Sequence, residues 1–150
     1  MIDTSIFCEI LKVPGKSNQH EAVLEELTKK IEAGSTLFLP YSTIIETGNH
    51  IAQVKKKWGN SYEIAKNYVK TIENTLLGQA PWVALSMPNE DDLKEWLPLF
   101  PDYAAKTIGA GDATIIGDYS KLCKRHRYLT VAIWSLDQDL KGYVRVWDDF

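Results

Sequence analysis

Short apolar runs alternate along this chain with longer stretches of helical periodicity, and this alternation limits the folds that it can adopt. The predicted strands are residues 1–7, 36–39, 82–85, 128–134 and, as a weaker edge strand, 143–147. The predicted helices are residues 20–33, 42 to about 57, 61–78, 90 until the prolines at 98 and 101, and 111 or 112 to about 124. Alternation of this kind favours an α/β fold in which helices cover a mostly parallel sheet.

The length and composition fit a single soluble domain over residues 1–150. The chain has 150 residues, of which 45% are hydrophobic and 25% charged, as in ordinary globular domains. No apolar run approaches the roughly 20 residues that cross a bilayer, and no secretory signal is recognisable at the N-terminus. We therefore expect a cytoplasmic protein without a membrane partner.

The cysteines and histidines do not suggest a metal site. Cys8 and Cys123 stand alone in apolar contexts, so we expect two buried, unpaired thiols rather than a disulfide. His20, His50 and His126 are scattered and lack the spacing of zinc ligands.

Four acidic residues lie at the edges of apolar segments where the chain is expected to turn: Asp3, Glu46, Asp112 and Asp137. Ligands of α/β sheets bind beyond the carboxyl ends of the strands, so all four are candidates for one rim. Carboxylates gathered in one cleft repel one another unless cations join them. Oxygen ligands of this type suit Mg²⁺ or Mn²⁺.

Helical spacing distinguishes among the acids. Asp112 shares one face with Ile115 and Ile116, so its carboxylate leans toward the core side of its helix. Asp118 falls off that face and is expected to be solvated. Glu46 lies nearly opposite the apolar stripe of its helix. The spacing alone favours a solvated residue, but it does not distinguish a solvent face from a cleft face.

Two basic clusters stand out in a chain of net charge −3. Each is either a solvated helix end, where cations suit the helix dipole, or a set of RNA-phosphate contacts. The net charge argues against a nucleic-acid partner, but the distribution of charge matters more than its sum. The candidate contacts are Lys55, Lys56, Lys57, Lys121, Lys124, Arg125 and Arg127.

The four acidic segments occur in an order that resembles the PIN domain, the metal-dependent ribonuclease fold of VapC-type toxins. The motifs are Asp3-Thr4-Ser5 on the first apolar segment, Glu46 in a helix after a short strand, Asp112 with Ala and aliphatics at a helix start, and residues 135–140 after a strand. The resemblance spans almost the whole chain. The chain departs from it in having only two residues before Asp3 and a long middle section.

This resemblance implies a PIN-like α/β/α sandwich and hydrolysis of RNA phosphodiester bonds. It makes Asp3, Glu46, Asp112 and Asp137 the catalytic and metal-binding residues for Mg²⁺ or Mn²⁺. It also makes Asp139 an additional ligand, and Ser5 and Ser135 residues that orient the acids or the attacking water. A VapC-like toxin would have an antitoxin protein as a partner, and homodimers are usual among such proteins.

Two other functions are compatible with the sequence. One is a Mg²⁺-dependent phosphatase with an aspartate nucleophile, although such enzymes have Asp-x-Asp where this chain has Asp3-Thr4-Ser5. The other is a catalytically inactive PIN-fold module that binds RNA or protein, against which the intact set of four acids argues. A phospho-aspartate intermediate would favour the phosphatase, and RNA binding without turnover would favour the inactive module.

Overall fold

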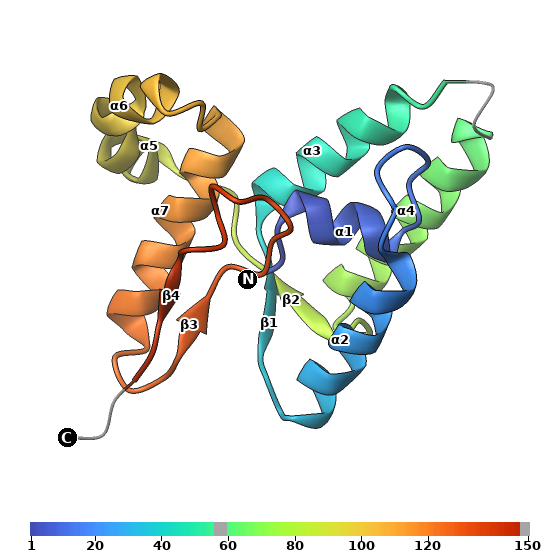
Figure 1. The fold of residues 1–150 in the computed structure, drawn as a ribbon, viewed down its shortest axis with the longest axis horizontal. Helices are drawn as coiled ribbons and strands as arrows, with labels where there is room; N and C mark the ends of the chain where they lie inside the picture. The colour runs from blue at the N-terminus through green and yellow to red at the C-terminus, as the bar shows by residue number, and fades with distance from the viewer. Residues whose placement is uncertain (56–59, 148–150) are drawn as a thin grey trace.

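The computed structural model describes residues 1–55 and 60–147 and has a mixed α/β fold (Figure 1). The helices are α1 (Thr4–Ile10), α2 (His20–Glu32), α3 (Tyr41–Ala52), α4 (Ser61–Leu76), α5 (Glu90–Trp96), α6 (Phe100–Ala105) and α7 (Ala110–Arg125), with a 3-10 turn η2 (Leu97–Leu99) between α5 and α6. The strands are β1 (Leu37–Leu39), β2 (Trp82–Ala84), β3 (Val131–Ala132) and β4 (Val144–Arg145). The predicted mixed α/β class is confirmed.

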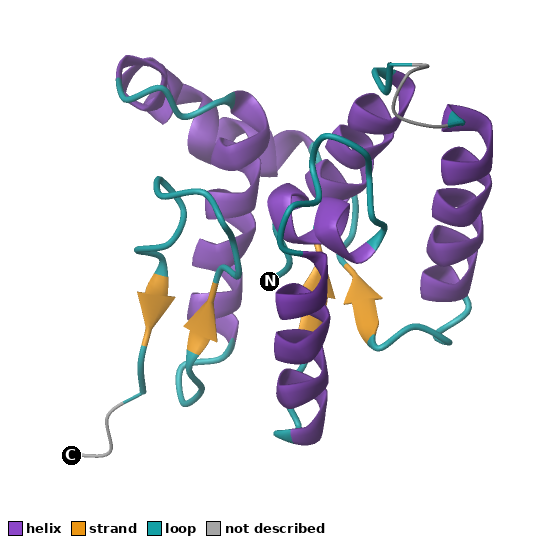
Figure 2. Cartoon of the chain, turned by 45° about the vertical axis from the view of Figure 1, so that its right-hand side comes forward, coloured by secondary structure: helices purple, strands orange, loops and turns teal. Residues whose placement is uncertain are grey.

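The strands form two short pairs, which the N-terminal segment links. β1 and β2 are parallel, β3 and β4 are antiparallel, and the N-terminus lies between the pairs (Figure 2). The amide of Ile2 donates to the carbonyl of Phe38 at 2.8 Å, and the amide of Trp134 donates to the carbonyl of Met1 at 2.7 Å. Residues 1–3 therefore join β1 to the segment that follows β3, although the sheet is narrower than the sequence predicts.

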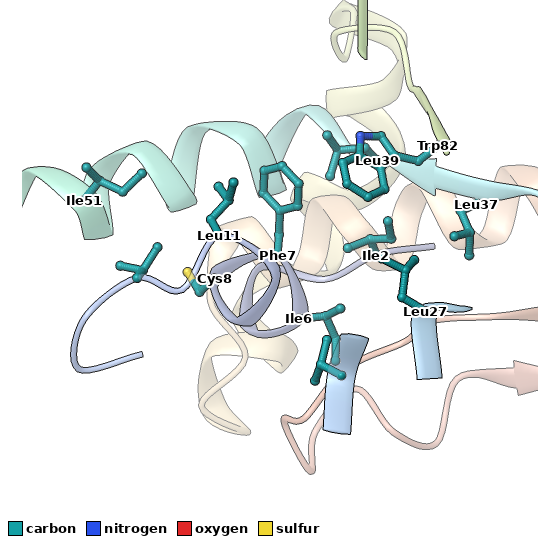
Figure 3. Packing of buried hydrophobic residues seen from close by; sticks show 12 residues of the cluster. Ile2, Ile6, Phe7, Cys8, Leu11, Leu27, Leu37, Leu39, Ile51 and Trp82 are labelled. Atoms are coloured by element: carbon teal, nitrogen blue, oxygen red, sulfur yellow. The ribbon is translucent and has the colours of Figure 1, made fainter. Parts of the chain in front are cut away.

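Side chains from these central segments enter two hydrophobic cores on opposite faces. Ile2 and Leu39 belong to the core beneath α1 to α4, which Figure 3 shows. Met1 and Ile133 belong to the core against α7. Because successive side chains of an extended segment point to opposite faces, helices cover both sides of the central segments.

The first core is anchored by two aromatic rings. Phe7 meets Trp82 edge to face, with ring centroids 5.7 Å apart, and the indole N–H of Trp82 donates to the Thr75 hydroxyl at 2.8 Å. The Thr43 hydroxyl donates to the carbonyl of Ile2 at 3.0 Å. These contacts fix α1, α3 and α4 around the first extended residues of the chain, which end at Asp3.

The predicted strand over residues 1–7 is wrong beyond Asp3, because α1 begins at Thr4. The Asp3 side chain accepts from the amide of Ser5 and caps the helix, as an aspartate before a first turn commonly does. Ile6, Phe7 and Cys8 are all buried. A helix buried on every side has no polar stripe, so its sequence resembles a buried strand.

Several other helix boundaries reflect glycine and proline chemistry, whereas α3 ends at Ala52 and not near residue 57 as predicted. Gly34 and Gly78 end α2 and α4 with φ of 71° and 70°, the left-handed conformation that favours glycine after a helix, as the sequence predicts. α5 ends at Trp96, before the two prolines, as predicted, but further helical structure includes both Pro98 and Pro101. Each lies in the first turn of the next element, η2 or α6, where the missing proline N–H costs no hydrogen bond.

The predicted strands near the C-terminus are longer than those observed. The segment 128–134 is paired only at Val131–Ala132 and, through a single bridge, at Trp134. Tyr128 is exposed and packs against Trp147, so it contributes to a surface aromatic pair rather than to a core.

The two cysteines and the lengths of the helices also bear on the sequence predictions. Both cysteines are unpaired and Cys8 is buried, as predicted, whereas Cys123 is only half-buried. Within the described residues, no helix is both long enough and apolar enough to span a bilayer.

Candidate functional site

A cleft of about 470 Å³ brings together the four acids that the sequence singles out. Asp3 caps α1, Glu46 lies in α3, Asp112 lies in the first turn of α7, and Asp137 follows β3. The cleft is also lined by Thr4, Ser5, Cys8, Lys16, Asn49, His50, Gln53 and Leu136. The fold thus gathers carboxylates from segments up to 134 residues apart in the chain.

Two serine hydroxyls hold the Asp3 carboxylate, which is only 3% exposed. Ser5 and Ser135 donate to Asp3 Oδ2 at 2.7 and 2.8 Å. The amides of Leu136 and Asp137 donate in turn to the Ser5 and Ser135 hydroxyls, both at 2.9 Å. Ser5 and Ser135 therefore tie the start of α1 to the loop after β3, and each orients Asp3.

Glu46 is turned into the cleft by a residue that sequence reasoning missed. The Thr4 hydroxyl donates to Glu46 Oε2 at 2.7 Å. The same carboxylate lies against the first turn of α7, where a Cβ built on Gly111 would come within 2.0 Å of Glu46 Oε1. These two neighbours turn Glu46 toward the cleft, which it lines. The position is also favourable for a carboxylate, because it lies beside a helix N-terminus.

Gly111 offers a way to displace Glu46 without changing its chemistry. We expect Gly111→Ala to push the flexible Glu46 carboxylate out of place and to impair any activity that needs it. Alanine should cost little stability, because it gains about 0.5–1 kcal/mol of helix propensity. Gly117→Ala is the matched control on the same helix, since its added Cβ would meet Trp96 at an ordinary 3.7 Å. Activity and urea denaturation of both variants test this, and equal activity in the two would show that Glu46 placement is unimportant.

Asp112 is the acid most affected by its surroundings. Burial, and then the nearby charges of Asp3, Glu46 and Asp137, raise the pKa of Asp112 to about 6. Both effects disfavour the ionised form. The effect of the other three acids on this pKa agrees with their position in the same cleft.

Asp118, on the same helix, corrects a sequence expectation. It was expected to be solvated, but it is 8% exposed, and burial raises its pKa to about 6 in spite of the opposing charge of Lys121. The reason is that α5 packs over this side of α7, where Lys121 Nζ lies 2.5 Å from Asp92 Oδ1 and 3.8 Å from Asp118 Oδ1. Helical spacing cannot reveal a second layer of helices.

The raised pKa of Asp112 predicts a specific pH dependence of stability. Between about pH 4 and pH 6 the folded state holds a proton on Asp112 that the unfolded state has lost, so the free energy of unfolding falls as pH rises. Asp112→Asn should therefore stabilise the metal-free protein by about 1 kcal/mol at pH 7, after allowance for solvent screening and the lost helix-dipole interaction. The gain should vanish near pH 4.

Urea denaturation at pH 4, 5, 6 and 7 measures this difference, with Asp118→Asn as the matched control. The free energy of unfolding of each variant, relative to that of the wild type, should increase with rising pH, because both carboxyls have raised pKa values in the wild type. Only Asp112→Asn should change the response to divalent cations. A stability difference that stays constant with pH would mean that folding does not raise the pKa of Asp112.

Asp137 and Asp139 differ in position. Asp137 lines the cleft, and its Oδ1 accepts from the amide of Asp139 at 2.9 Å. The Asp139 side chain is exposed and is not among the residues that line the cleft. The structure therefore places Asp137 in the cleft with the other acids, whereas Asp139 does not line the cleft.

Among the basic residues predicted to contact RNA, those that the structure describes do not line the cleft. Lys121 is engaged by Asp92 and Asp118. Lys124, Arg125 and Arg127 lie at or beyond the end of α7 opposite Asp112, roughly 20 Å away at 1.5 Å per helical residue. Lys55 is exposed and also does not line the cleft, while the predictions for Lys56 and Lys57 fall outside the described residues.

Lys16 and His50 line the cleft although the sequence analysis did not select them. Burial lowers the pKa of His50, the charge of Lys16 lowers it further, and Glu46 opposes them. One signal was present in the sequence, because His50 follows Glu46 by four residues and so shares its helix face. Nothing in the sequence places Lys16, which lies in the loop between α1 and α2.

The carboxylates do not converge on a single point. Within residues 1–55 and 60–147, no group of three or more His, Cys, Asp or Glu side chains is arranged to hold a metal ion. Asp3 and Glu46 instead accept hydrogen bonds from neighbouring hydroxyls. Comparisons with protein-family models, curated proteins and solved structures find no match.

Proposed function

We propose that this protein is a metal-dependent ribonuclease of the PIN-like, VapC type, which hydrolyses RNA phosphodiester bonds in the acidic cleft. The observation that carries the proposal is the shared cleft of Asp3, Glu46, Asp112 and Asp137, in which burial and the other three acids raise the pKa of Asp112 to about 6. A cleft with this concentration of carboxylates is costly unless a cation joins it.

The chemical type of the four side chains suits a hard divalent cation, although no three of them surround one point within the described residues. All four side chains offer carboxylate oxygens, which Mg²⁺ and Mn²⁺ prefer, whereas zinc sites usually include His or Cys. Asp3, Asp112 and Asp137 would be the principal ligands, and Glu46 would be a further ligand or would position water. When bound, the ion would supply an activated water and compensate charge on the scissile phosphate.

The surrounding residues have separate tasks in this proposal. Ser5 and Ser135 hold Asp3 in one orientation, and Thr4 holds Glu46. Asp112 must lose its proton before it can bind a cation, so activity should rise as pH increases through about 6. No Ser or Cys nucleophile is required, and burial, which raises the pKa of the Cys8 thiol to about 11, makes the Cys8 thiolate scarce at neutral pH.

Two features support a PIN-like assignment over the phosphatase alternative. The order of the four acidic motifs resembles that of the PIN family, and helices pack on both faces of the central segments, as a sandwich requires. A phosphatase of the kind considered above needs an Asp-x-Asp motif, and Ser5 stands at the position of its second aspartate. In the structure the Ser5 hydroxyl donates to Asp3, so it orients that carboxylate.

The direct test is cleavage of single-stranded RNA by the purified full-length protein in Mn²⁺, in Mg²⁺ and in EDTA. We expect cleavage only with a divalent cation. Because water is the nucleophile, the products should carry no 2′,3′-cyclic phosphate, which separates this activity from contaminating metal-independent ribonucleases. Release of phosphate through a trapped phospho-aspartate would favour the phosphatase, and RNA binding without cleavage would favour the inactive module.

A further inference from the structure

An acidic cleft needs a cation to hold a polyanionic substrate, since phosphate contacts dominate the affinity for nucleic acids. Of the described residues that line the cleft, Lys16 is the one lysine or arginine. The structure gives it no ion pair within the described part of the chain. Its ammonium group is therefore available to a ligand in the cleft.

The loop that carries Lys16 is fixed at both ends. Val13 is fully buried, and its carbonyl accepts from the amide of Lys16 at 3.0 Å. The carboxylate of Glu9, 3% exposed, accepts from the amides of Asn18 and Gln19 at 3.0–3.1 Å. In Figure 1 this loop, in blue, arcs away from the end of α1. The backbone of Lys16 is thus held in place beside the cleft.

A polar face of α3 continues the cleft away from the acids. Glu46, Asn49, His50 and Gln53 all line it, at the spacing that places side chains on one helix face. From Glu46 to Gln53 the helix rises about 10 Å. Lys16 lines the same cleft as these residues, which places it beside this face of α3, and its charge contributes to the lowered pKa of His50.

We propose that Lys16 and this face of α3 form the track that holds one strand of RNA beside the four acids, with Lys16 contacting a backbone phosphate. The amide groups of Asn49 and Gln53 can donate further hydrogen bonds to the strand. The inference rests on the proposed ribonuclease function and replaces the distant cluster at the end of α7 as the source of phosphate contacts at the cleft.

The test compares three variants, Lys16→Gln, Lys16→Arg and Lys124→Gln. Lys124 is the matched control, because it is exposed and lies at the opposite end of α7. Binding of a fluorescent single-stranded RNA is measured by anisotropy in Mg²⁺ over a series of salt concentrations, with all variants in an Asp112→Asn chain to prevent turnover. Steady-state cleavage is measured in the otherwise wild-type chain.

Lys16→Gln should weaken RNA binding roughly 10-fold and reduce the salt dependence by about one phosphate contact. In cleavage it should raise KM much more than it lowers kcat, because the contact is uniform between bound substrate and transition state. Lys16→Arg should restore most of the affinity, and Lys124→Gln should match the parent chain.

Failure of this inference is distinguishable from failure of the proposed function. Metal-dependent cleavage with the same KM and affinity in Lys16→Gln as in the parent would overturn the track and leave the ribonuclease intact. If the wild-type chain binds RNA through Lys16 but does not cleave it, the track stands and the ribonuclease fails. Absence of RNA binding by the parent chain would overturn the track.

Discussion

Asp112→Asn should lower Mn²⁺-dependent RNA cleavage by more than the roughly 100-fold that loss of an outer-shell partner costs a metal site. The reason is that Asp112 lies in the cleft with the other three acids and is electrostatically coupled to each of them. Asparagine keeps the shape of the side chain but removes the charge that a divalent cation needs. The fold should persist, because the metal-free variant is expected to be slightly more stable than the wild type.

Asp118→Asn is the control for this experiment. It lies on the same helix, is buried and has a similarly raised pKa, but it does not line the cleft. Cleavage rates of both variants are compared over a series of Mn²⁺ concentrations, with circular dichroism to check folding. Equal cleavage by the wild type and Asp112→Asn would remove Asp112 from the mechanism. Equal losses in the two variants would point to a shared effect on α7.

The second large effect is stabilisation by divalent cations. At 100 times its dissociation constant a bound ion adds about 2.7 kcal/mol to the free energy of unfolding. For a domain of this size, 1 kcal/mol corresponds to about 2–4 °C, so saturating Mn²⁺ or Mg²⁺ should raise Tm by roughly 5–10 °C at pH 7.5. Relief of repulsion among the four carboxylates is the physical cause.

The metal-induced shift should depend on pH in a defined direction. With its pKa raised to about 6, Asp112 is mostly protonated at pH 5, and a cation must displace that proton. One unit below the pKa this costs about 1.4 kcal/mol, so the Tm shift should be clearly smaller at pH 5 than at pH 7.5. Thermal melts at both pH values, with Asp112→Asn beside the wild type, measure this. A shift of equal size in the variant would exclude Asp112 as a ligand.

Local sequence signals predicted the outline of this fold well. Gly34 and Gly78 mark helix ends because a left-handed residue is needed there, and glycine meets that need at little cost. Alternating apolar segments gave the mixed α/β class. Both signals arise from residues that are close together in the sequence.

The errors arise where distant parts of the chain decide the outcome. Residues 4–10 form a helix with buried side chains on all of its faces. The sequence therefore lacks the alternation of polar and apolar faces that identifies a helix. Asp118 is covered by a neighbouring helix layer, and Lys121 is held there by Asp92. Each of these environments is created by packing between segments that the sequence does not show to be neighbours.

The candidate site shows the same division. The positions of Asp3 and Asp137 after apolar segments suggested a shared rim. The turn of Glu46 into the cleft, however, depends on the Thr4 hydroxyl and on the small Gly111. Lys16 reaches the cleft because a buried glutamate anchors its loop. The Glu46 contacts join residues that are distant along the chain, and the loop contact depends on the burial of Glu9, so local sequence signals reveal neither.

The most direct test of the central claim is paramagnetic broadening by Mn²⁺ in a two-dimensional NMR spectrum of the full chain. A small amount of Mn²⁺ should broaden, together, the amide signals around Asp3, Glu46, Asp112 and Asp137, while signals near Lys124 at the other end of α7 stay sharp. Asp112→Asn should require more Mn²⁺ for the same effect. Broadening confined to one of the four segments, or none at millimolar Mn²⁺, would contradict a shared cation site.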